Sequence, residues 1–509
     1  MLLLSSRYNR AIGALISIAL ILLLYITLAT ETTRSWLAIS SNFRIRPTPN
    51  PFTVEELYQE VNITDWGGTG RRVKKLSHWA TSLIKDPSAD RSAFESALLL
   101  LFDFLRSSEG SIYKPWSSST NSATSSLQLG IVVCVGFKNV HMAGHLIASL
   151  RRVHDSKAAI EVAYAGDDDL SPGKRAFLKT LDPELSFINL LDVFPTIQSD
   201  LLGGGWAMKP FALLASSYPR TILVDADAIF LSNPDIVFDA HPGLSRTGAL
   251  FFHDRGAGSG RYTRGKQWLE QQMQAANISP SHHLTNKSLF WSGQVDYEAD
   301  SGVVALDKSR PAIVLGLMFA TWMNTKKVRD AVTYTMFHGD KETFWIAMEL
   351  SGVEYSFDPW YAGAIGEITD REDWDEGDRQ RASGLGRQEK EESVVLPEPE
   401  KLCSDHMLHL DHSGQAPFWF NGGMYRDKRT DTLELARMTH YWVGNSSDIR
   451  LTQPESGWFW LNGVIACLLE RNIMVLPEDV KRVVERIEKE AKRVDELAVD
   501  FKWEGQGIL

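Results

Sequence analysis

Cysteine is scarce in this chain, with three among 509 residues: Cys134, Cys403 and Cys467. Three cysteines cannot supply the several disulfides of a small secreted scaffold, and no two of them have the spacing of metal ligands. Cys134 lies within an apolar run, which is typical of a buried small hydrophobic side chain. A single bridge between Cys403 and Cys467 is compatible with an oxidising compartment, and the sequence alone leaves it open.

An excess of positive charge is also missing. The net charge of −11 excludes the basic footprint of a nucleic-acid-binding protein. No internal repeat is visible. With 44% hydrophobic and 10% aromatic residues the chain can bury a substantial core. Its length exceeds what one core normally organises, so we expect one large domain with appendages, or two domains.

Charge is absent altogether from Ala11 to Ala29, a run of 19 residues preceded by Arg7 and Arg10. At about 1.5 Å per residue such a helix spans about 28 Å, the thickness of one hydrocarbon core. The run is longer than the apolar part of a cleaved signal peptide, and no Ala-x-Ala site follows it. Basic residues on the short N-terminal side favour a cytoplasmic N-terminus. We therefore expect a single-pass anchor with a lumenal body.

Four Asn-x-Ser/Thr sequons fit a lumenal body: Asn62, Asn277, Asn286 and Asn445. Asn277 is the weakest of them, because a proline follows its Ser279. The composition divides the chain into a cytoplasmic tail (1–10), the anchor (11–29), a stem with a helical region (30–126), a main domain (127–460) and a C-terminal helical extension (461–509). Within these parts, residues 371–392 read as a charged mobile loop and 477–497 as an amphipathic surface helix.

From residue 127 onward, apolar runs alternate with helical stretches of about ten residues, which indicates βαβ units and a parallel sheet. The predicted strands are 130–136, 160–165, 187–190 and the run ending at Val224. The predicted helices are 141–153, 172–181 and 210–217. The acidic turn 167–169 is interpreted as a solvated cap of the helix that follows it.

Two carboxylates, Asp225 and Asp227, stand at the end of the apolar run Ile222–Val224. An uninterrupted apolar run is typical of a strand buried in a parallel sheet. Ligand sites in open α/β sheets lie beyond the carboxyl ends of the strands. Hard oxygen ligands suit Mg²⁺ or Mn²⁺, and such ions commonly also hold substrate phosphates. The pattern therefore predicts a nucleotide-sugar-dependent glycosyltransferase.

Around this pair the sequence resembles retaining glycosyltransferases with the GT-A fold, and more closely the fungal α-mannosyltransferases of glycosyltransferase family 71, typified by Golgi α-1,3-mannosyltransferases. The resemblance covers about residues 127–425. The segments that carry it are Gly130–Gly136, Tyr164–Ser171, Gly205–Phe211, Lys209–Tyr218, Val224–Phe238, Thr247–Phe252, Asp300–Val304, His338–Trp345 and His409–Gly422.

This resemblance implies an α/β fold: a GT-A-type, mostly parallel sheet flanked by helices, preceded by a single N-terminal transmembrane anchor and stem. It implies a type II Golgi membrane enzyme that moves mannose from GDP-mannose to a mannosylated glycan with retention, forming an α-1,3 linkage with Mn²⁺ or Mg²⁺. Membership of a Golgi mannosyltransferase complex is compatible with it. The alternatives are an α-1,2-mannosyltransferase of the same family, a transferase that uses another nucleotide sugar, or an inactive glycan-binding relative.

The same resemblance assigns the donor side of the site. Asp225 and Asp227 would hold the metal, whose charge neutralises the departing nucleotide. Lys209 corresponds to a donor-site lysine that meets a phosphate. Ser301 and Gly302 would lie where the backbone approaches the donor closely.

Further carboxylates are candidates for catalysis and positioning. Asp300 could accept hydrogen bonds from sugar hydroxyls. Asp340 matches the GT-A position that lines the donor pocket and is favoured over Glu342, which can pair with a neighbouring lysine instead. On the acceptor side, Trp419 and Asn421 are the candidates, because apolar faces of sugars stack on aromatic rings.

The third metal ligand is also assigned by resemblance. Retaining GT-A enzymes commonly complete their metal site with a histidine that opens a late segment of the form histidine, glycine, proline, aromatic. His409 stands at that position here, and imidazole is a reasonable Mn²⁺ ligand. His412 and Asp411 are the alternatives.

Overall fold

The computed structural model describes residues 54–501, apart from 87, 89–90, 108–111, 116–127, 256–262, 386–397, 430–432, 445–457 and 462–464. The chain divides into two compact units, Met1–Val54 and Glu55–Leu509. The predicted anchor, 11–29, lies outside the described residues. Within the part of the chain that the structure describes, no helix combines the length and the apolarity needed to cross a bilayer. The predicted boundaries at residues 30, 127 and 461 remain predictions.

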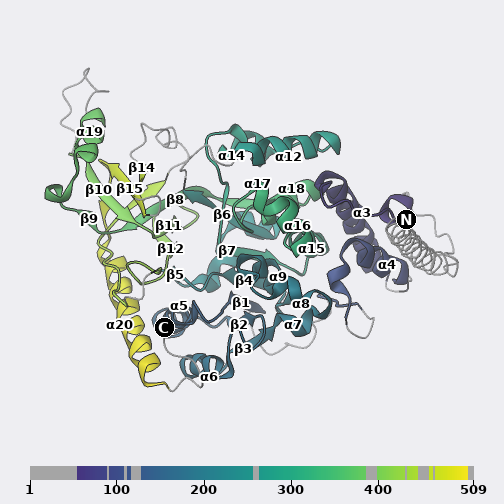
Figure 1. Cartoon of the computed structure of the whole chain (residues 1–509), viewed down its shortest axis with the longest axis horizontal. Helices are drawn as coiled ribbons and strands as arrows, with labels where there is room; N and C mark the ends of the chain where they lie inside the picture. Colours follow the sequence, from purple (N-terminus) through teal and green to yellow (C-terminus); the bar gives the residue numbers. More distant parts are fainter. Residues whose placement is uncertain are drawn as a thin grey trace, which may run out of the picture. The chain divides into compact units, whose positions relative to one another are not determined.

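One half of the central sheet is parallel, as the alternating pattern predicts (Figure 1). Its strands lie in the order β3-β2-β1-β4, and every pair among them is parallel. The bounds of these strands are β1 Leu129–Cys134, β2 Ala159–Tyr164, β3 Ser186–Asn189 and β4 Arg220–Val224. The connecting helices are α5 Val140–Ala148, α6 Pro172–Leu181, α7 Leu190–Val193, α8 Gln198–Leu201 and α9 Met208–Ala215.

The other half of the sheet is mostly antiparallel, so the prediction of a mostly parallel sheet holds for one half only. Beyond β4 the order is β7-β6-β8-β11-β12-β5, and β6 and β8 form the one parallel pair of this path. β13 pairs with β8 and with β16. The bounds are β5 Ala228–Phe230, β6 Ala249–Arg255, β7 Ala299–Asp307, β8 Ser356–Gly366, β11 Met407–Leu410, β12 Pro417–Asn421, β13 His440–Gly444 and β16 Met474–Val475.

A second, four-stranded sheet has the order β14-β15-β10-β9. It consists of β9 Ile368–Thr369, β10 Glu400–Ser404, β14 Trp458–Leu461 and β15 Ile465–Glu470. Cys403 and Cys467 stand opposite each other on β10 and β15 and form a disulfide. The bridge that the sequence left open is therefore present. Cys134, at the end of β1, is a free thiol of intermediate exposure.

Helices complete the fold, and their remaining bounds are α2 Val54–Leu57, α3 Trp66–Lys85, α4 Ser92–Leu101, α10 Val237–Ala240, α11 Pro242–Thr247, α12 Thr263–Ala275, α13 His282–Asn286, α14 Leu289–Ser292, α15 Pro311–Met323, α16 Lys326–Val328, α17 Tyr334–Met336, α18 Thr343–Ser351, α19 Glu376–Leu385 and α20 Glu478–Asp500. The apolar helix α15 packs between α3, α9 and α18. α20 is amphipathic as predicted, and its buried Val494 and Ala498 join the core beside α5.

Two local predictions are wrong. The segment 376–385 is a helix and not a loop: the backbone N–H of Asp378 donates to Asp375 and that of Asp375 donates to Asp378, the reciprocal pattern of a capping box. The buried Asp378 also pairs with Lys401 at 2.5 Å. The acidic turn does not cap α6 either, because the hydroxyl of Ser171 accepts from the first turn of that helix.

Candidate active site

A cleft of about 810 Å³ opens where β4 and β1 end and β7 begins. Its lining includes seven of the predicted site residues: Lys209, Asp225, Asp227, Asp300, Ser301, Asp340 and Asn421. They come from α9, the β4–β5 turn, β7, the segment before α18 and β12. The tertiary fold therefore brings together segments up to about 200 positions apart around the end of one buried strand.

Lys209 lies at the centre of the charged groups. Its Nζ lies 2.8 Å from the Asp225 carboxylate and 3.9 Å from that of Asp340, and it donates to the Ser301 hydroxyl at 3.1 Å. Burial by itself would lower the pKa of Lys209, but the negative charges of Asp225 and Asp340 raise it instead. The side chain is thus a buried, fully charged cation.

The carboxylates around Lys209 outnumber it. Burial raises the pKa of Asp225 to about 7 against the opposing charge of Lys209, and the neighbouring Asp227 adds to the rise. Burial also raises the pKa of Asp340. The Oδ2 of Asp340 is buried and has no hydrogen-bond partner. The cluster therefore has more negative charge than one lysine balances, which is the condition for binding a further cation.

The Asp227 carboxylate pairs with a cation that was not predicted from the sequence. Lys428 lines the cleft and forms an ion pair with Asp227. The backbone N–H groups of Gly422 and Gly423 donate to the carbonyl of Asp227 at 3.0 and 2.6 Å, which fixes the loop after β12 over the Asp-x-Asp turn. The run Asp427-Lys428-Arg429 was the available signal, but an isolated charge run is common on surfaces.

Asp300 joins the cleft to the predicted metal histidine. Its Oδ2 lies 3.0 Å from Nε2 of His409, and its Oδ1 accepts from the Asn421 amide at 3.2 Å. Burial would raise the pKa of Asp300, but the hydrogen bond and charge of His409 lower it to about 2. Gly302 is required beside them, since an added Cβ would lie 2.7 Å from Asn421 Nδ2 and 3.0 Å from the Trp419 ring.

Trp419 lies away from the cleft surface. It is completely buried, and its ring stacks on the His409 imidazole with centroids 3.9 Å apart. In this structure it therefore orients His409 and offers no face to a sugar. The indole that does line the cleft is that of Trp206, which is 53% exposed.

Asp340 and Glu342, the two carboxylate candidates, occupy different surroundings. Asp340 lines the cleft, whereas Glu342 is completely buried beneath it. Glu342 accepts from the backbone N–H groups of Glu298 and Ala299 and from the indole N–H of Trp345. Burial raises the pKa of Glu342 to about 8. Its contacts are those of a structural group that holds the start of β7.

The residues at the Asp-x-Asp turn suit a divalent cation. Asp225 and Asp227 offer hard carboxylate oxygens to the cleft. Oδ2 of Asp340 has no hydrogen-bond partner, so it is available to a cation or to a hydrogen-bond donor. His409 has its Nε2 at Asp300 and a buried Nδ1 without a hydrogen-bond partner. Among the described residues, Asp225, Asp227 and His409 do not converge to within 4.8 Å as three ligands. His409 as the third ligand remains a prediction.

The alternatives for that ligand stand elsewhere. Asp411 accepts from Ser413, Gln415 and Ala416 within its own turn, and the exposed His412 contacts the ring of His241. One acidic residue of the turn after β2 does reach the cleft: Asp169 lines it and accepts from the N–H of Ala165 at 2.9 Å.

Three of the four sequon asparagines, Asn62, Asn277 and Asn286, are exposed, and Asn445 lies outside the described residues.

The family model described as "Mannosyltransferase putative" matches residues 128–411, more than half of the chain. The chain therefore belongs to this family of mannosyltransferases. The matched residues include His409 and all of the predicted residues that line the cleft except Asn421.

Curated relatives carry the same activity in their names. A Candida albicans protein named "Putative alpha-1,3-mannosyltransferase MNN12" is 26% identical over 381 residues, which are 64% of this chain and 42% of that protein. Alpha-1,3-mannosyltransferase MNN1 of Saccharomyces cerevisiae is 25% identical over 333 residues, 58% of this chain and 40% of that protein. The chain thus spans about two fifths of the length of these relatives.

Among solved structures, the Mn/GDP form of core-mannan synthase A (CmsA/Ktr4) from Aspergillus fumigatus aligns with 46% of this chain and 73% of its own. The sequence identity is 12% and the TM-score is 0.30. A likeness at that score supports no conclusion about function.

Proposed function

We propose that this chain is a metal-dependent retaining glycosyltransferase that transfers mannose from GDP-mannose to a mannosylated glycan and forms an α-1,3 linkage during protein glycosylation. The observation that carries the proposal is the cleft at the end of β4, where two carboxylates, two lysines and a third, buried carboxylate with one unpartnered oxygen face one space. The family and the names of its members support mannosyl transfer and the α-1,3 linkage. GDP-mannose as the donor and a mannosylated glycan as the acceptor rest on the resemblance of the sequence segments.

In the proposed reaction, negative charge develops on the departing diphosphate, and positively charged groups of the cleft would stabilise it. The bond between the anomeric carbon and the diphosphate oxygen breaks, a bond from that carbon to an acceptor hydroxyl oxygen forms, and the hydroxyl proton leaves with the diphosphate or to solvent. A divalent cation held by Asp225 and Asp227 would supply positive charge to the departing diphosphate. Lys209 and Lys428 add two fixed positive charges at the same place, where a preformed electrostatic environment is most effective.

Sugar positioning falls to the neutral and acidic groups beside the lysines. The amide of Asn421 and the carboxylates of Asp300 and Asp340 present both donors and acceptors to the cleft. His409 and the buried Trp419 behind Asp300 fix its orientation. A hydroxylated ring held by such preoriented groups loses little further freedom on reaching the transition state.

We also propose that the body works in the Golgi lumen behind the 11–29 anchor, alone or with other Golgi mannosyltransferases. The exposed sequons at Asn62, Asn277 and Asn286 and the Cys403–Cys467 disulfide support an oxidising, glycosylating compartment. Protease protection of the body in intact vesicles, together with a glycosidase-sensitive mass shift, would support this topology. Digestion in intact vesicles would reverse it.

The function is tested by product formation. Purified full-length chain is incubated with Mn²⁺, mannobiose and, separately, GDP-mannose, GDP-fucose, UDP-glucose and UDP-galactose. We expect one product, from GDP-mannose, with an α-1,3-linked mannose identified by NMR. A product from a different nucleotide sugar, an α-1,2 linkage, or no product from GDP-mannose and mannobiose would each contradict the proposal.

A further inference from the structure

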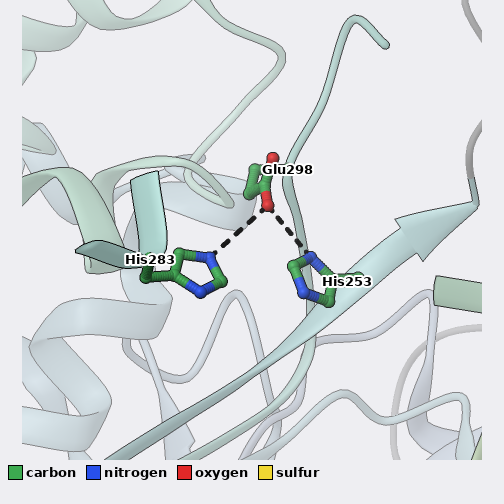
Figure 2. A group of neighbouring side chains, drawn as sticks. All are labelled: His253, His283 and Glu298. Atoms are coloured by element: carbon green, nitrogen blue, oxygen red, sulfur yellow. Dashed lines mark ion pairs between the residues drawn. The ribbon is translucent and has the colours of Figure 1, made fainter. Parts of the chain in front are cut away.

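A second group of candidate metal ligands lies outside the cleft and comes from three separate elements. His253 is on β6, His283 is on α13, and Glu298 directly precedes β7. One nitrogen of each imidazole and one oxygen of the carboxylate all lie within 4.8 Å of one another. Figure 2 shows both rings directing a nitrogen at the same carboxylate oxygen. None of these three residues lines the cleft.

The spacing of these atoms suits a small tetrahedral ion. Two ligand atoms bound at about 2.05 Å to a tetrahedral zinc ion lie about 3.3 Å apart. Nδ1 of His253 lies 3.1 Å from Oε1 of Glu298, and Nε2 of His283 lies 3.6 Å from the same oxygen. Both nitrogens are buried, and neither meets the geometry of a hydrogen bond. Both imidazoles form ion pairs with this carboxylate in the structure, at distances that also match those between two ligands of one metal ion.

The surroundings fix the orientation of all three groups. The ring of Phe357 stacks on both imidazoles, with centroids 4.3 and 4.9 Å away. Oε2 of Glu298 accepts from the Ser288 hydroxyl at 2.7 Å and the Phe290 N–H at 3.0 Å, and Oε1 accepts from the Tyr361 hydroxyl at 3.0 Å. Partners that orient the ligands in this way are characteristic of metal centres.

We propose that His253, His283 and Glu298 bind one divalent transition-metal ion of the zinc class, at a structural site distinct from the Asp-x-Asp turn. Two imidazoles and one carboxylate form a donor set that zinc uses, whereas Mg²⁺ and Mn²⁺ prefer oxygen. The His283 side chain is 16% exposed and the other two are buried, so the group comes nearest to solvent at His283. The ion joins α13 to the strand pair β6–β7 and so supports the start of β7, where Asp300 and Ser301 enter the cleft.

The test separates this site from the cleft. The full-length Asp225→Ala/Asp227→Ala variant, which lacks the carboxylates proposed for the catalytic cation, is loaded with Zn²⁺, dialysed and analysed for metal content. We expect one zinc ion per chain. Adding His283→Ala to that variant should weaken zinc binding by more than about 100-fold. His282→Ala is the matched control, since this neighbouring histidine is exposed and should leave zinc binding unchanged.

A second measurement covers the case in which His283→Ala does not fold. X-ray absorption of zinc in the Asp225→Ala/Asp227→Ala variant should count two imidazole ligands. Absence of bound zinc from that variant, full retention of zinc after His283→Ala, or fewer than two imidazoles in the spectrum would overturn the proposal. None of these outcomes depends on transferase activity, so a failed activity assay and a failed zinc assay remain distinguishable.

Discussion

A buried lysine lies beside each end of helix α9, and the two lysines differ in which groups balance their positive charge. Lys209, at its N-terminal end, faces the carboxylates of the cleft, which raise its pKa. Lys308 follows β7 at the opposite edge of the sheet and donates to the carbonyls of Leu213 and Ser216, where the helix ends. Burial lowers the pKa of Lys308 to about 7, against the opposing charge of Glu161.

The difference shows what distinguishes a ligand site from a structural site. The cleft is lined by charged side chains of both signs, and Oδ2 of Asp340 there has no hydrogen-bond partner, so an incoming cation or diphosphate has partners available. At the opposite edge, Lys308 donates to neutral carbonyls at the end of the helix that otherwise lack a donor, so this lysine has a structural role. Burial is similar in the two places, and only the balance of charges differs.

The largest expected effect comes from the carboxylates that make the cleft edge acidic. Asp225→Ala or Asp227→Ala should lower kcat by at least about 10³-fold, because the charge that holds the cation is lost. EDTA should stop the wild-type reaction, and Mn²⁺ should restore it. Initial rates at saturating GDP-mannose provide the measurement. Near-normal turnover in either variant would show that the Asp-x-Asp turn is not the metal site.

Exchanging each lysine for methionine tests the comparison directly. Lys209→Met should lower kcat/KM by about 10²–10³-fold, since a positive charge at the diphosphate is removed. Lys308→Met removes an equally buried lysine at the other edge and should leave kcat unchanged. Equal losses of activity in the two variants would mean that α9 transmits a general packing defect and that Lys209 has no special role.

Asp340 and Glu342 give a similar contrast within one segment. Asp340→Asn should lower kcat/KM by about 10- to 100-fold with an unchanged melting temperature, because a positioning group in the cleft is altered. Glu342→Gln should instead destabilise the fold by about 1–3 kcal/mol, since both carboxyl oxygens accept hydrogen bonds and the amide NH2 that replaces one of them cannot accept. Thermal melts and steady-state kinetics on both variants would decide; the reverse pattern would move the catalytic assignment to Glu342.

The last expected effect is on stability and not on activity: a pH dependence of the free energy of unfolding that comes from Lys308. Its pKa in the folded state, about 7, lies below the ordinary value of 10.5, so between these values the unfolded chain binds more protons. The free energy of unfolding should therefore rise with pH from about 7 to about 10 by on the order of a few kcal/mol relative to Lys308→Met. Denaturant titrations of both proteins at several pH values measure the difference. A flat difference would mean that Lys308 is charged in the folded protein.

Much of the parallel half of the sheet could be predicted because its signals are local. Helix α6 has the predicted bounds, Pro172–Leu181, since proline at its first position and the Ser171 cap fix its start. β1, β2 and β3 begin and end one or two residues before the predicted positions, and β4 ends at Val224 as predicted. Continuous apolar runs mark β1, β2 and β4, which are buried, whereas β3 lies at the edge of the sheet and is only half-buried. The antiparallel half was not predicted, since the direction of β7 beside β4 depends on pairing between residues about 80 positions apart.

In the candidate site, too, the residues with local sequence signals were predicted and those that depend on distant contacts were not. Asp225 and Asp227 were found because an apolar run and two carboxylates stand next to each other in the chain. Lys428 was missed because its relation to Asp227 exists only after the loop following β12 folds over the turn. Trp419 was assigned to the acceptor, yet the antiparallel pairing of β11 and β12 places it opposite His409 and buries it.

Three features can be recognised from the order of residues alone: the strand that ends in the Asp-x-Asp turn, the family segments around it, and the apolar patterns of the first half of the sheet. Each of these patterns lies within a short stretch of the chain, so it can be recognised without knowledge of the fold. Which charged groups meet depends on how the chain folds in three dimensions. Lys209 rather than Lys308 lies among carboxylates, and Glu298 rather than Asp300 lies between two histidines, because such pairings depend on the approach of distant strands and helices. Burial and charge balance at a given position are properties of that approach, and no stretch of sequence contains them.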